Sequence, residues 1–343
     1  MKIAVVGKFN TENVGVHIEE TLMDMGHEVV RIDPQVNFLQ YKVLGRRINN
    51  LSKSFYNNFL DKIPKVRRIK SKRIFNDFEK NRIDLTIVLH DFLNSEEVDQ
   101  IKLVTKSPIV IWFPDAISNF GRSLFFIAGY DFLFFKDKYV VGKLRNEMGL
   151  NAYYLPQCCN PKVHNKLNIT NEESGIYKCD ITNAGNLYPS RAALLKQLTE
   201  FDFKMWGAPP SVWMDIRELK KMVMGREVFN FEKVNAFSSA KIVLNNLHMA
   251  EINGLNKRAF EIPACGGFQI ISYNEAVSEL FEIGKEIVVY KDLSDLKSKI
   301  RYFLDSKNQE ERERIAEAGY YRAINEHTYF HRLTSMLETI FTN

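Results

Sequence analysis

The sequence predicts an α/β protein built from two Rossmann-like halves, each a parallel sheet with helices on both faces. Its 343 residues exceed what one ordinary hydrophobic core accommodates. Short apolar strand patterns alternate with helical patterns from end to end, which is typical of parallel sheets. Several of these strands are almost entirely apolar, as expected for strands buried on both faces. The composition, 45% hydrophobic and 26% charged, is that of a globular protein.

The first half contains the first predicted sheet. Its strands are predicted at residues 3–7, 27–33, 84–90, 108–115, 131–137 and 151–156. Helical patterns occupy residues 12–25, 95–105 and 138–148, and a basic stretch lies among them. We therefore assign residues 1–156 to an N-terminal Rossmann-like domain.

The second half repeats the alternation after a polar stretch with little periodicity. We interpret residues 157–176 as an interdomain linker with a surface loop. Further strands are predicted at residues 177–186, 201–207, 241–246, 268–272 and 286–292, and helices at 293–305, 309–326 and 329–342. Residues 177–327 form the predicted second domain, and residues 328–343 a C-terminal helix that can pack back on the first domain. Because ligands bind at the carboxyl ends of parallel strands, we expect the site in a cleft between the domains.

The sequence lacks the motifs that are typical of several common kinds of site. The turn VGKFNTENVG after the first strand matches neither a dinucleotide fingerprint nor a P-loop, although Gly7 and Gly15 allow close approach to a ligand or serve the turn alone. The four cysteines show no CxxC spacing and are interpreted as reduced thiols. No apolar run approaches the ~20 residues of a membrane span. These features favour a cytoplasmic protein without a metal site.

Residues 41–82 form a strongly basic stretch. It contains thirteen lysines and arginines against three acidic residues, with apolar and aromatic residues at roughly helical spacing. One interpretation is a pair of helices with a solvated basic face. The other is a peripheral contact with an anionic membrane surface, at the inner membrane face. We expect no nucleic-acid partner, because no recognised module accompanies the charge.

Candidate site residues follow predicted strands in both halves. Gly185 ends a strand, and Ser190 is a suitable N-cap for a helix carrying Arg191 in its first turn. A glycine, a helix N-terminus and a cation together favour a diphosphate site, whereas the alternative is an ordinary capped helix. In the first half, His90 and Asp115 lie at predicted strand ends, where a structural role is an equal alternative.

The segment NKRAFEIPACGGFQII, residues 256–271, departs from the pattern of a plain core helix. A helix beginning near Asn256 places Arg258 and Glu261 on one side, and Gly266 ends it. Pro263 violates the local helix rule, and such violations concentrate at functional sites. The carboxylate can accept ribose hydroxyls while the arginine binds a phosphate oxygen. The alternative is an internal ion pair.

These residues carry a resemblance to a known family. LNNLH (244–248), NGLNKRAFEIPACGGFQII (253–271) and LKSKIRYFLDSKNQEERERIAEAGYYRAINEHTYFHR (296–332) resemble the C-terminal domain of GT-B glycosyltransferases. The similarity is greatest to the group of the spore maturation protein CgeB, related to the retaining group-1 (GT4-type) enzymes. It covers about residues 177–335, and the first half agrees only in architecture. It implies a nucleotide-diphosphate-sugar donor bound by the second domain, an acceptor held by the first, and no metal or other cofactor.

The resemblance also implies roles for individual residues. Glu261 matches the second glutamate of the family's EX7E motif, which holds the ribose, whereas Asn253 occupies the place of the first. Arg191 fits the second place of a basic pair, Asn186 replaces the first cation, and Arg258 can supply the missing charge. The predicted donor-binding residues are Gly185, Asn186, Arg191, Asn245, His248, Asn256, Arg258, Glu261, Gly266 and Gly267. Asp115, and after it His90, are the predicted catalytic groups on the acceptor side.

The sequence thus predicts a metal-independent, retaining, hexosyltransferase-like enzyme. The acceptor is a cell-surface glycan, a lipid-linked saccharide or a protein. One alternative is a nucleotide-sugar epimerase of the same fold, with His90, Asp115 and His248 converging on the sugar. Another is a non-catalytic member that binds only nucleotide or membrane, which the asparagine at position 253 favours.

Overall fold

The computed structural model describes residues 1–10, 13–34, 55, 63–121, 123–166 and 175–342. Its first sheet consists of β1 (Lys2–Val6), β2 (Glu28–Ile32), β3 (Leu85–Leu89), β4 (Ile109–Phe113), β5 (Phe132–Phe135) and β6 (Ala152–Tyr154). The strand order is β2-β1-β3-β4-β5-β6, and every pairing is parallel. The six predicted strands of the first half are therefore confirmed.

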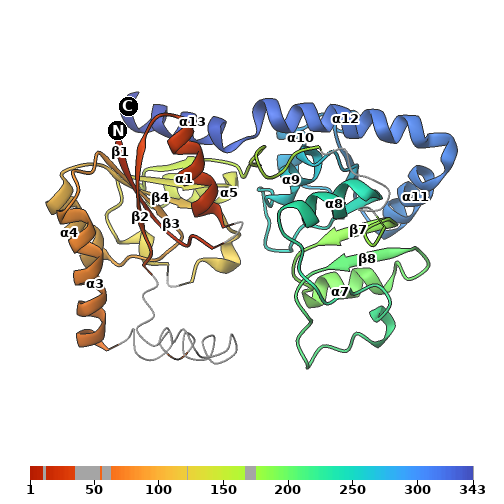
Figure 1. Cartoon of the computed structure of the whole chain (residues 1–343), viewed down its shortest axis with the longest axis horizontal. Helices are drawn as coiled ribbons and strands as arrows, with labels where there is room; N and C mark the ends of the chain where they lie inside the picture. Colours follow the sequence, from red (N-terminus) through yellow and green to blue (C-terminus); the bar gives the residue numbers. More distant parts are fainter. Residues whose placement is uncertain (11–12, 35–54, 56–62, 122, 167–174, 343) are drawn as a thin grey trace.

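The second sheet lies beside the first and is also parallel (Figure 1). It consists of β7 (Cys179–Ala184), β8 (Phe203–Trp206), β9 (Ala240–Asn245), β10 (Gln269–Ser272) and β11 (Val288–Tyr290). The strand order is β11-β10-β9-β7-β8. The order reverses between β1 and β3 in one sheet and between β7 and β9 in the other. Ligand crevices form at such reversals, outside the carboxyl ends of the strands.

Helices cover both sheets. Beside the first sheet lie α1 (Val14–Asp24), α3 (Pro64–Glu79), α4 (Ser95–Thr105) and α5 (Lys138–Asn146). Beside the second lie α7 (Pro189–Lys196), α8 (Phe231–Ser239), α9 (Arg258–Ala264), α10 (Glu275–Leu280), α11 (Leu293–Leu304) and α12 (Gln309–Glu326), and the last helix is α13 (Tyr329–Thr342). Single 3₁₀ turns occur at Ile117–Asn119, Leu124–Phe126, Arg217–Leu219 and Ser306–Asn308.

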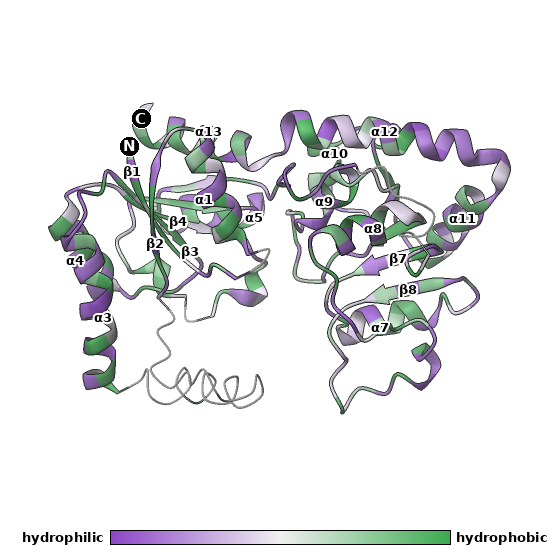
Figure 2. Ribbon diagram, viewed as in Figure 1, coloured by the Kyte–Doolittle hydropathy of each residue, from purple (hydrophilic) through white to green (hydrophobic). Residues whose placement is uncertain are grey.

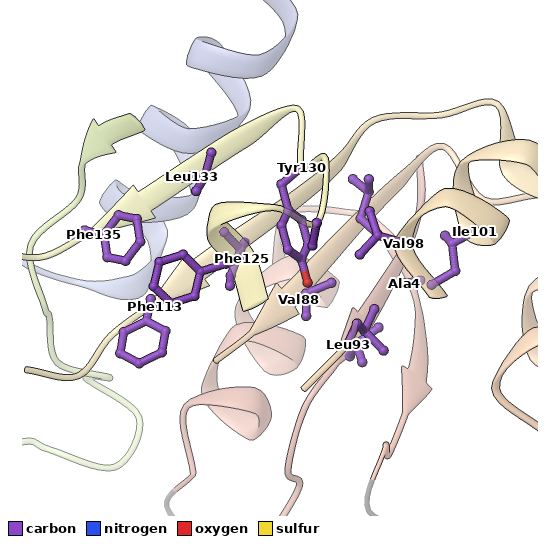
Figure 3. Close-up of a cluster of buried hydrophobic side chains, with 14 of the residues drawn as sticks. Ala4, Val88, Leu93, Val98, Ile101, Phe113, Phe125, Tyr130, Leu133 and Phe135 are labelled. Carbon is purple, nitrogen blue, oxygen red and sulfur yellow. The ribbon is translucent and has the colours of Figure 1, made fainter. Parts of the chain in front are cut away.

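Apolar side chains fill the space between the first sheet and its helices. Phe113 and Phe135 project from β4 and β5, and Phe125 packs against both with ring centroids 5.7 and 5.4 Å away (Figure 3). Val98 and Ile101 of α4 are fully buried in the same cluster. In Figure 2 the strands of this sheet are largely hydrophobic, while α3 carries much hydrophilic surface. The burial pattern explains the near-continuous apolar strands of the sequence.

The end of the chain returns to the first domain. Helix α12 runs along the second domain and α13 lies over the first, beside α1 (Figure 1). Tyr329, Leu333 and Met336 of α13 are buried against β1 and β3. Arg332 donates to the carbonyl oxygens of Pro156 (2.9 Å) and Gln157 (3.1 Å). Helix α13 therefore holds the segment that follows β6 against the first domain.

The segment after β6 differs from its predicted surface position. Gln157, Cys158, Cys159, Asn160 and His164 are all buried. The reason is tertiary: Cys159 forms a main-chain bridge to Thr328, so the segment runs between the domains. The polar residues that made it resemble a surface loop are buried against partners from both domains. Residues 167–174 lie outside the described part. All four cysteines are buried, and none of them forms a disulfide.

Only part of the basic stretch is described, namely residue 55 and residues 63–82, and the rest lies outside the description. Its helix α3 buries Ile74 and Phe78. Glu97 of α4 accepts from Arg67 (3.2 Å) and Ser71 (2.7 Å) of α3. Among the side chains of α3 whose exposure the structure describes, the exposed basic ones are Lys65, Arg68, Lys72 and Arg73. Among the described residues, no helix combines the length and apolar character needed to cross a membrane.

Candidate functional site

Two adjoining cavities open between the domains at the strand ends. The first has a volume of about 410 Å³ and the second about 370 Å³. Both are lined by Asn13 of the first domain and by Asn186, Tyr188, Lys257 and Arg258 of the second. Because they share these walls, the cavities form one continuous cleft.

The first cavity lies mainly against the second domain. One wall is formed by Trp206 and Gly207 at the end of β8, with residues 227–229. The lining also includes Lys233, Lys257, Arg258 and Glu261. A cavity lined by both aromatic and cationic side chains suits a ligand that has a ring and negative charge.

Glu261 lines the first cavity, and its two carboxylate oxygens have different surroundings. Oε1 lies 3.3 Å from His164 Nε2, 3.3 Å from Lys257 Nζ and 3.6 Å from Lys233 Nζ. Oε2 is buried and has no hydrogen-bond partner within the described residues. Burial raises the pKa of Glu261, but the lysines, His164 and Arg258 together hold that pKa well below its ordinary value. The side chain is therefore a charged acceptor with one unused oxygen, which has a high free-energy cost unless a ligand donates to it.

Pro263 is accommodated by a side chain from β10. A proline in α9 cannot donate to the carbonyl four residues earlier, which belongs to Ala259. Gln269 Nε2 donates to that carbonyl instead, at 3.1 Å. Gln269 Oε1 in turn accepts from Asn245 Nδ2 at 2.8 Å. Asn245 is fully buried behind the cleft, so it supports α9 and does not line either cavity.

Gly266 and Gly267 end α9 and also lie outside the cavity walls. Gly267 N donates to Ile262 O at 3.0 Å and Gly266 N to Pro263 O at 2.8 Å, which is the Schellman motif. Gly266 has φ +77°, a conformation that glycine adopts without strain. The double glycine was predicted to bind the donor, whereas in the structure it ends α9.

Gly185 makes room for Arg258. Its φ is +138°, and a Cβ there would lie 2.1 Å from Arg258 Nη1. That nitrogen donates to Ala184 O at 3.0 Å. Burial lowers the pKa of Arg258 from its ordinary value, with Glu261 opposing the shift. The guanidinium thus lies at the end of β7, among the residues that line both cavities.

Arg191 is not in the cleft. It is 1% exposed and lines neither cavity. Its Nε donates to Asn246 Oδ1 at 2.9 Å and its Nη1 to Asn186 O at 2.6 Å. Burial and then Arg258 lower its pKa to about 9. The arginine predicted to bind phosphate therefore holds two cleft loops from behind. The helix begins at Pro189 after an N-cap Tyr188, not at a Ser190 cap.

His90 and Asp115 meet in the second cavity. They follow β3 and β4, which are neighbours in the sheet, and His90 Nδ1 lies 3.6 Å from Asp115 Oδ2. Burial lowers the pKa of His90, and Asp115 opposes the shift only in part. His90 has φ +61°, which is uncommon for a residue other than glycine and concentrates at functional sites. The two residues predicted separately are thus one pair.

The sequence analysis missed a second pair in this cavity. Lys136, which follows β5, lies 2.6 Å from Glu251 of the second domain, and both line the cavity. Their side chains are 4% and 6% exposed, and Glu251 Oε2 has no hydrogen-bond partner among the described residues. Asn253 instead joins the domains, since its backbone nitrogen donates to Asp137 Oδ2 at 2.9 Å. The acidic residue that lines this cavity is therefore Glu251, two residues before position 253, where the resemblance placed a glutamate.

Of the remaining predicted residues, two line the cleft and two support the elements around it. His248 and Asn256 line the second cavity. The His248 ring packs edge-on against Tyr188 at 5.0 Å. Gly7 and Gly15 line neither cavity. A Cβ on Gly15 would lie 2.5 Å from Lys8 O, so this glycine allows α1 to begin close to the turn that places Asn13 in the cleft.

No group of three or more metal-ligating acids, histidines or cysteines occurs in the part of the chain that the structure describes.

The chain is similar to glycosyltransferase families and structures. Residues 191–338 match the family model described as glycosyl transferase-like. No curated protein matches the sequence.

Three solved structures superimpose over nearly the whole chain. A glycosyltransferase from Rickettsia africae gives a TM-score of 0.66 at 14% identity, covering 99% of this chain and 97% of its own. Sucrose-phosphate synthase from Thermosynechococcus elongatus gives 0.69 at 10% identity, covering 99% of both chains. HepE from Anabaena, solved in complex with UDP-glucose, gives 0.65 at 10% identity over 100% of both chains. The resemblance to the CgeB group in particular stays a prediction. Residues 191–338 thus match the glycosyl transferase-like family model, and the chain as a whole has the two-domain GT-B fold.

Proposed function

We propose that the protein transfers a sugar, a hexose in the first instance, from a nucleoside-diphosphate donor to an acceptor hydroxyl. The observation that carries this proposal is the unused Oε2 of Glu261, a buried acceptor on a charged side chain that lines a cavity together with Lys233, Lys257 and Arg258. A ribose offers two neighbouring hydroxyl donors to such an oxygen. The similarity of fold to HepE, which was solved with UDP-glucose, makes UDP-glucose the first donor to test.

In this proposal, different parts of the donor occupy the two cavities. The base lies in the first cavity between Trp206 and residues 227–229, and its ribose reaches Glu261. The diphosphate crosses the shared wall at Lys257 and Arg258. The sugar then enters the second cavity, where the unused oxygen of Glu251 can accept one of its hydroxyls.

We also propose that transfer needs no metal. Lys257, Arg258 and Lys233 supply positive charge where the leaving diphosphate develops negative charge, and fixed charges in a partly buried site stabilise such a transition state. Activity is expected to survive treatment with EDTA. Activity that disappears with EDTA and returns with added Mg²⁺ or Mn²⁺ would overturn this part of the proposal.

His90 and Asp115 are proposed to act on the acceptor. The acceptor oxygen forms a bond to the anomeric carbon as the bond from that carbon to the diphosphate breaks, and the imidazole takes the hydroxyl proton. Asp115 orients the ring and stabilises the charge that forms. The resemblance implies retention of configuration, which in a single step requires the acceptor to attack from the face that the diphosphate leaves. Attack from the opposite face would invert the configuration, and the anomeric signals of the first product in proton NMR distinguish the two.

The variants His90→Gln and Asp115→Asn are expected to lower turnover by about 10²–10⁴-fold and about tenfold respectively, with donor affinity unchanged. Because the pKa of His90 lies below its ordinary value, the neutral ring is present at neutral pH. The acidic limb of the pH–rate profile should therefore lie below the range of an ordinary histidine and vanish in His90→Gln. An unchanged profile in that variant would exclude His90 as the base.

Gly185→Ala is expected to displace Arg258 and to weaken UDP binding by roughly tenfold, the equivalent of about 1.4 kcal/mol. Gly284→Ala is the matched control, because Gly284 also has a positive φ, +85°, but a Cβ there meets nothing within 4 Å. Both variants should lose stability through backbone strain. Calorimetry with UDP distinguishes them, and equal losses of affinity would show that Arg258 does not contact the diphosphate.

The overall activity is tested with a panel of nucleotide sugars. Transfer or slow hydrolysis of one donor supports a glycosyltransferase. Interconversion of two sugars without release of nucleotide would establish the epimerase instead, and binding without turnover a non-catalytic member.

The acceptor is proposed to be lipid-linked and presented at an anionic membrane surface, which α3 contacts through its exposed side chains Lys65, Arg68, Lys72 and Arg73. Each basic residue near such a surface contributes up to ~1 kcal/mol of attraction. We expect co-sedimentation with phosphatidylglycerol vesicles at low salt and its loss near 1 M salt, where the Debye length is ~3 Å. Replacing the four residues with Gln should abolish it. Vesicle binding that ignores lipid charge, or none, would favour a glycan or protein acceptor that diffuses freely.

A further inference from the structure

The linker forms a closed turn behind Glu261. His164 N donates to Asn160 O at 2.7 Å, and Asn160 N donates to His164 Nδ1 at 3.2 Å. Lys162 N donates to Asn160 Oδ1 at 3.0 Å, which fixes the asparagine side chain. Because Nδ1 of the ring accepts, the proton of the neutral imidazole is on Nε2. Nε2 is the atom that lies 3.3 Å from Glu261 Oε1.

The same turn is attached to the first domain. Asn160 Nδ2 lies 2.9 Å from His17 Nδ1 and 3.1 Å from Glu20 Oε2, both on α1. His17 and His164 are 3% and 1% exposed, and their ring centroids are 5.9 Å apart. A continuous set of buried polar contacts therefore runs from α1 through the linker to the carboxylate in the second domain.

The His164 side chain is suited to hold a carboxylate without neutralising it. Burial lowers the pKa of His164 to about 3, so the ring is neutral at neutral pH and carries its proton on Nε2, the atom that lies 3.3 Å from Glu261 Oε1. Lys233 and Lys257 approach the same oxygen, Oε1. All three nitrogens thus lie beside Oε1 of Glu261, whereas Oε2 has no hydrogen-bond partner among the described residues, and Glu261 lines the first cavity.

We propose that His164 is a positioning residue that holds Oε1 of Glu261 so that Oε2 meets the ribose. Because the turn is anchored on α1, the first domain sets the orientation of a donor-binding group in the second. The inference rests on the proposed function, and it adds the linker to the nucleoside site.

Two substitutions test the roles of the two ring nitrogens of His164 separately. His164→Asn keeps an acceptor near the position of Nδ1 and removes the group that reaches Glu261. His164→Gln places an amide nitrogen near the position of Nε2 and restores the contact. The probes are UDP and 2′-deoxy-UDP, titrated by calorimetry into the full chain. We expect His164→Asn to bind UDP roughly tenfold more weakly, because the polar contact beside Oε1 that orients the charged carboxylate is lost. Its preference for UDP over 2′-deoxy-UDP should also fall toward one, and His164→Gln should recover both properties.

The matched control is His327→Asn. His327 is also buried, its Nε2 lies 2.8 Å from Leu280 O, and it lines neither cavity. It should lose thermal stability without changing the preference between the two ligands. If His164→Asn keeps the preference of the unsubstituted protein, or His164→Gln fails to restore it in a folded protein, the positioning role is overturned while the proposed function stands. If the unsubstituted protein binds neither UDP, GDP nor ADP, the proposed function and this inference both fail.

Discussion

Replacing Glu261 with Gln is expected to weaken UDP binding by roughly 10- to 100-fold, because a charged acceptor of ribose hydroxyls is worth about 1.5–3 kcal/mol. The amide keeps the shape of the side chain but removes the charge that the lysines and His164 surround. The pKa of Glu261 lies well below its ordinary value, so this loss should be the same throughout the neutral pH range. Calorimetry with UDP measures it.

Glu251→Gln is the matched control for this experiment. Glu251 is also a buried carboxylate with a lysine partner, but it lines only the second cavity. We expect Glu251→Gln to retain UDP affinity and to lower the affinity or turnover of UDP-glucose. If Glu261→Gln retains UDP affinity while its melting temperature falls, Glu261 is an internal ion-pair partner and the ribose assignment is wrong.

Lys136→Met is expected to lower the free energy of unfolding by about 3–5 kcal/mol, because it leaves the Glu251 carboxylate buried and unpaired. The two side chains belong to different domains, so the loss should also loosen the contact between them. Chemical denaturation of the full chain measures the first effect. Small-angle scattering, through the radius of gyration, measures the second.

The double variant Lys136→Met/Glu251→Leu removes both charges and should recover most of the lost stability. Glu251→Leu alone would leave the lysine unpaired and should resemble Lys136→Met. A loss in the double variant equal to the sum of the two single losses would mean that the ion pair does not couple the domains.

The sequence determined the strands and the positions of several site residues. Strands buried on both faces must be apolar, and a parallel connection requires an intervening segment, so alternation alone predicted both sheets. Arg258 and Glu261 could be found because Pro263 and the double glycine mark α9 as irregular. His90 and Asp115 could be found because residues after strands of a parallel sheet share one edge.

Only the tertiary structure decided which of these residues face the cleft and which support it. Arg191 was predicted as a ligand from its place in a helix, but the fold buries it against Asn246, 55 residues away in sequence. Lys136 and Glu251 are 115 residues apart, and no local pattern relates them. His164 was hidden in a segment that resembled a surface loop, because polar residues read the same in sequence whether water or buried partners satisfy them. Spacing along the chain specifies local conformation, whereas the partners of a buried charge depend on how two separate domains meet.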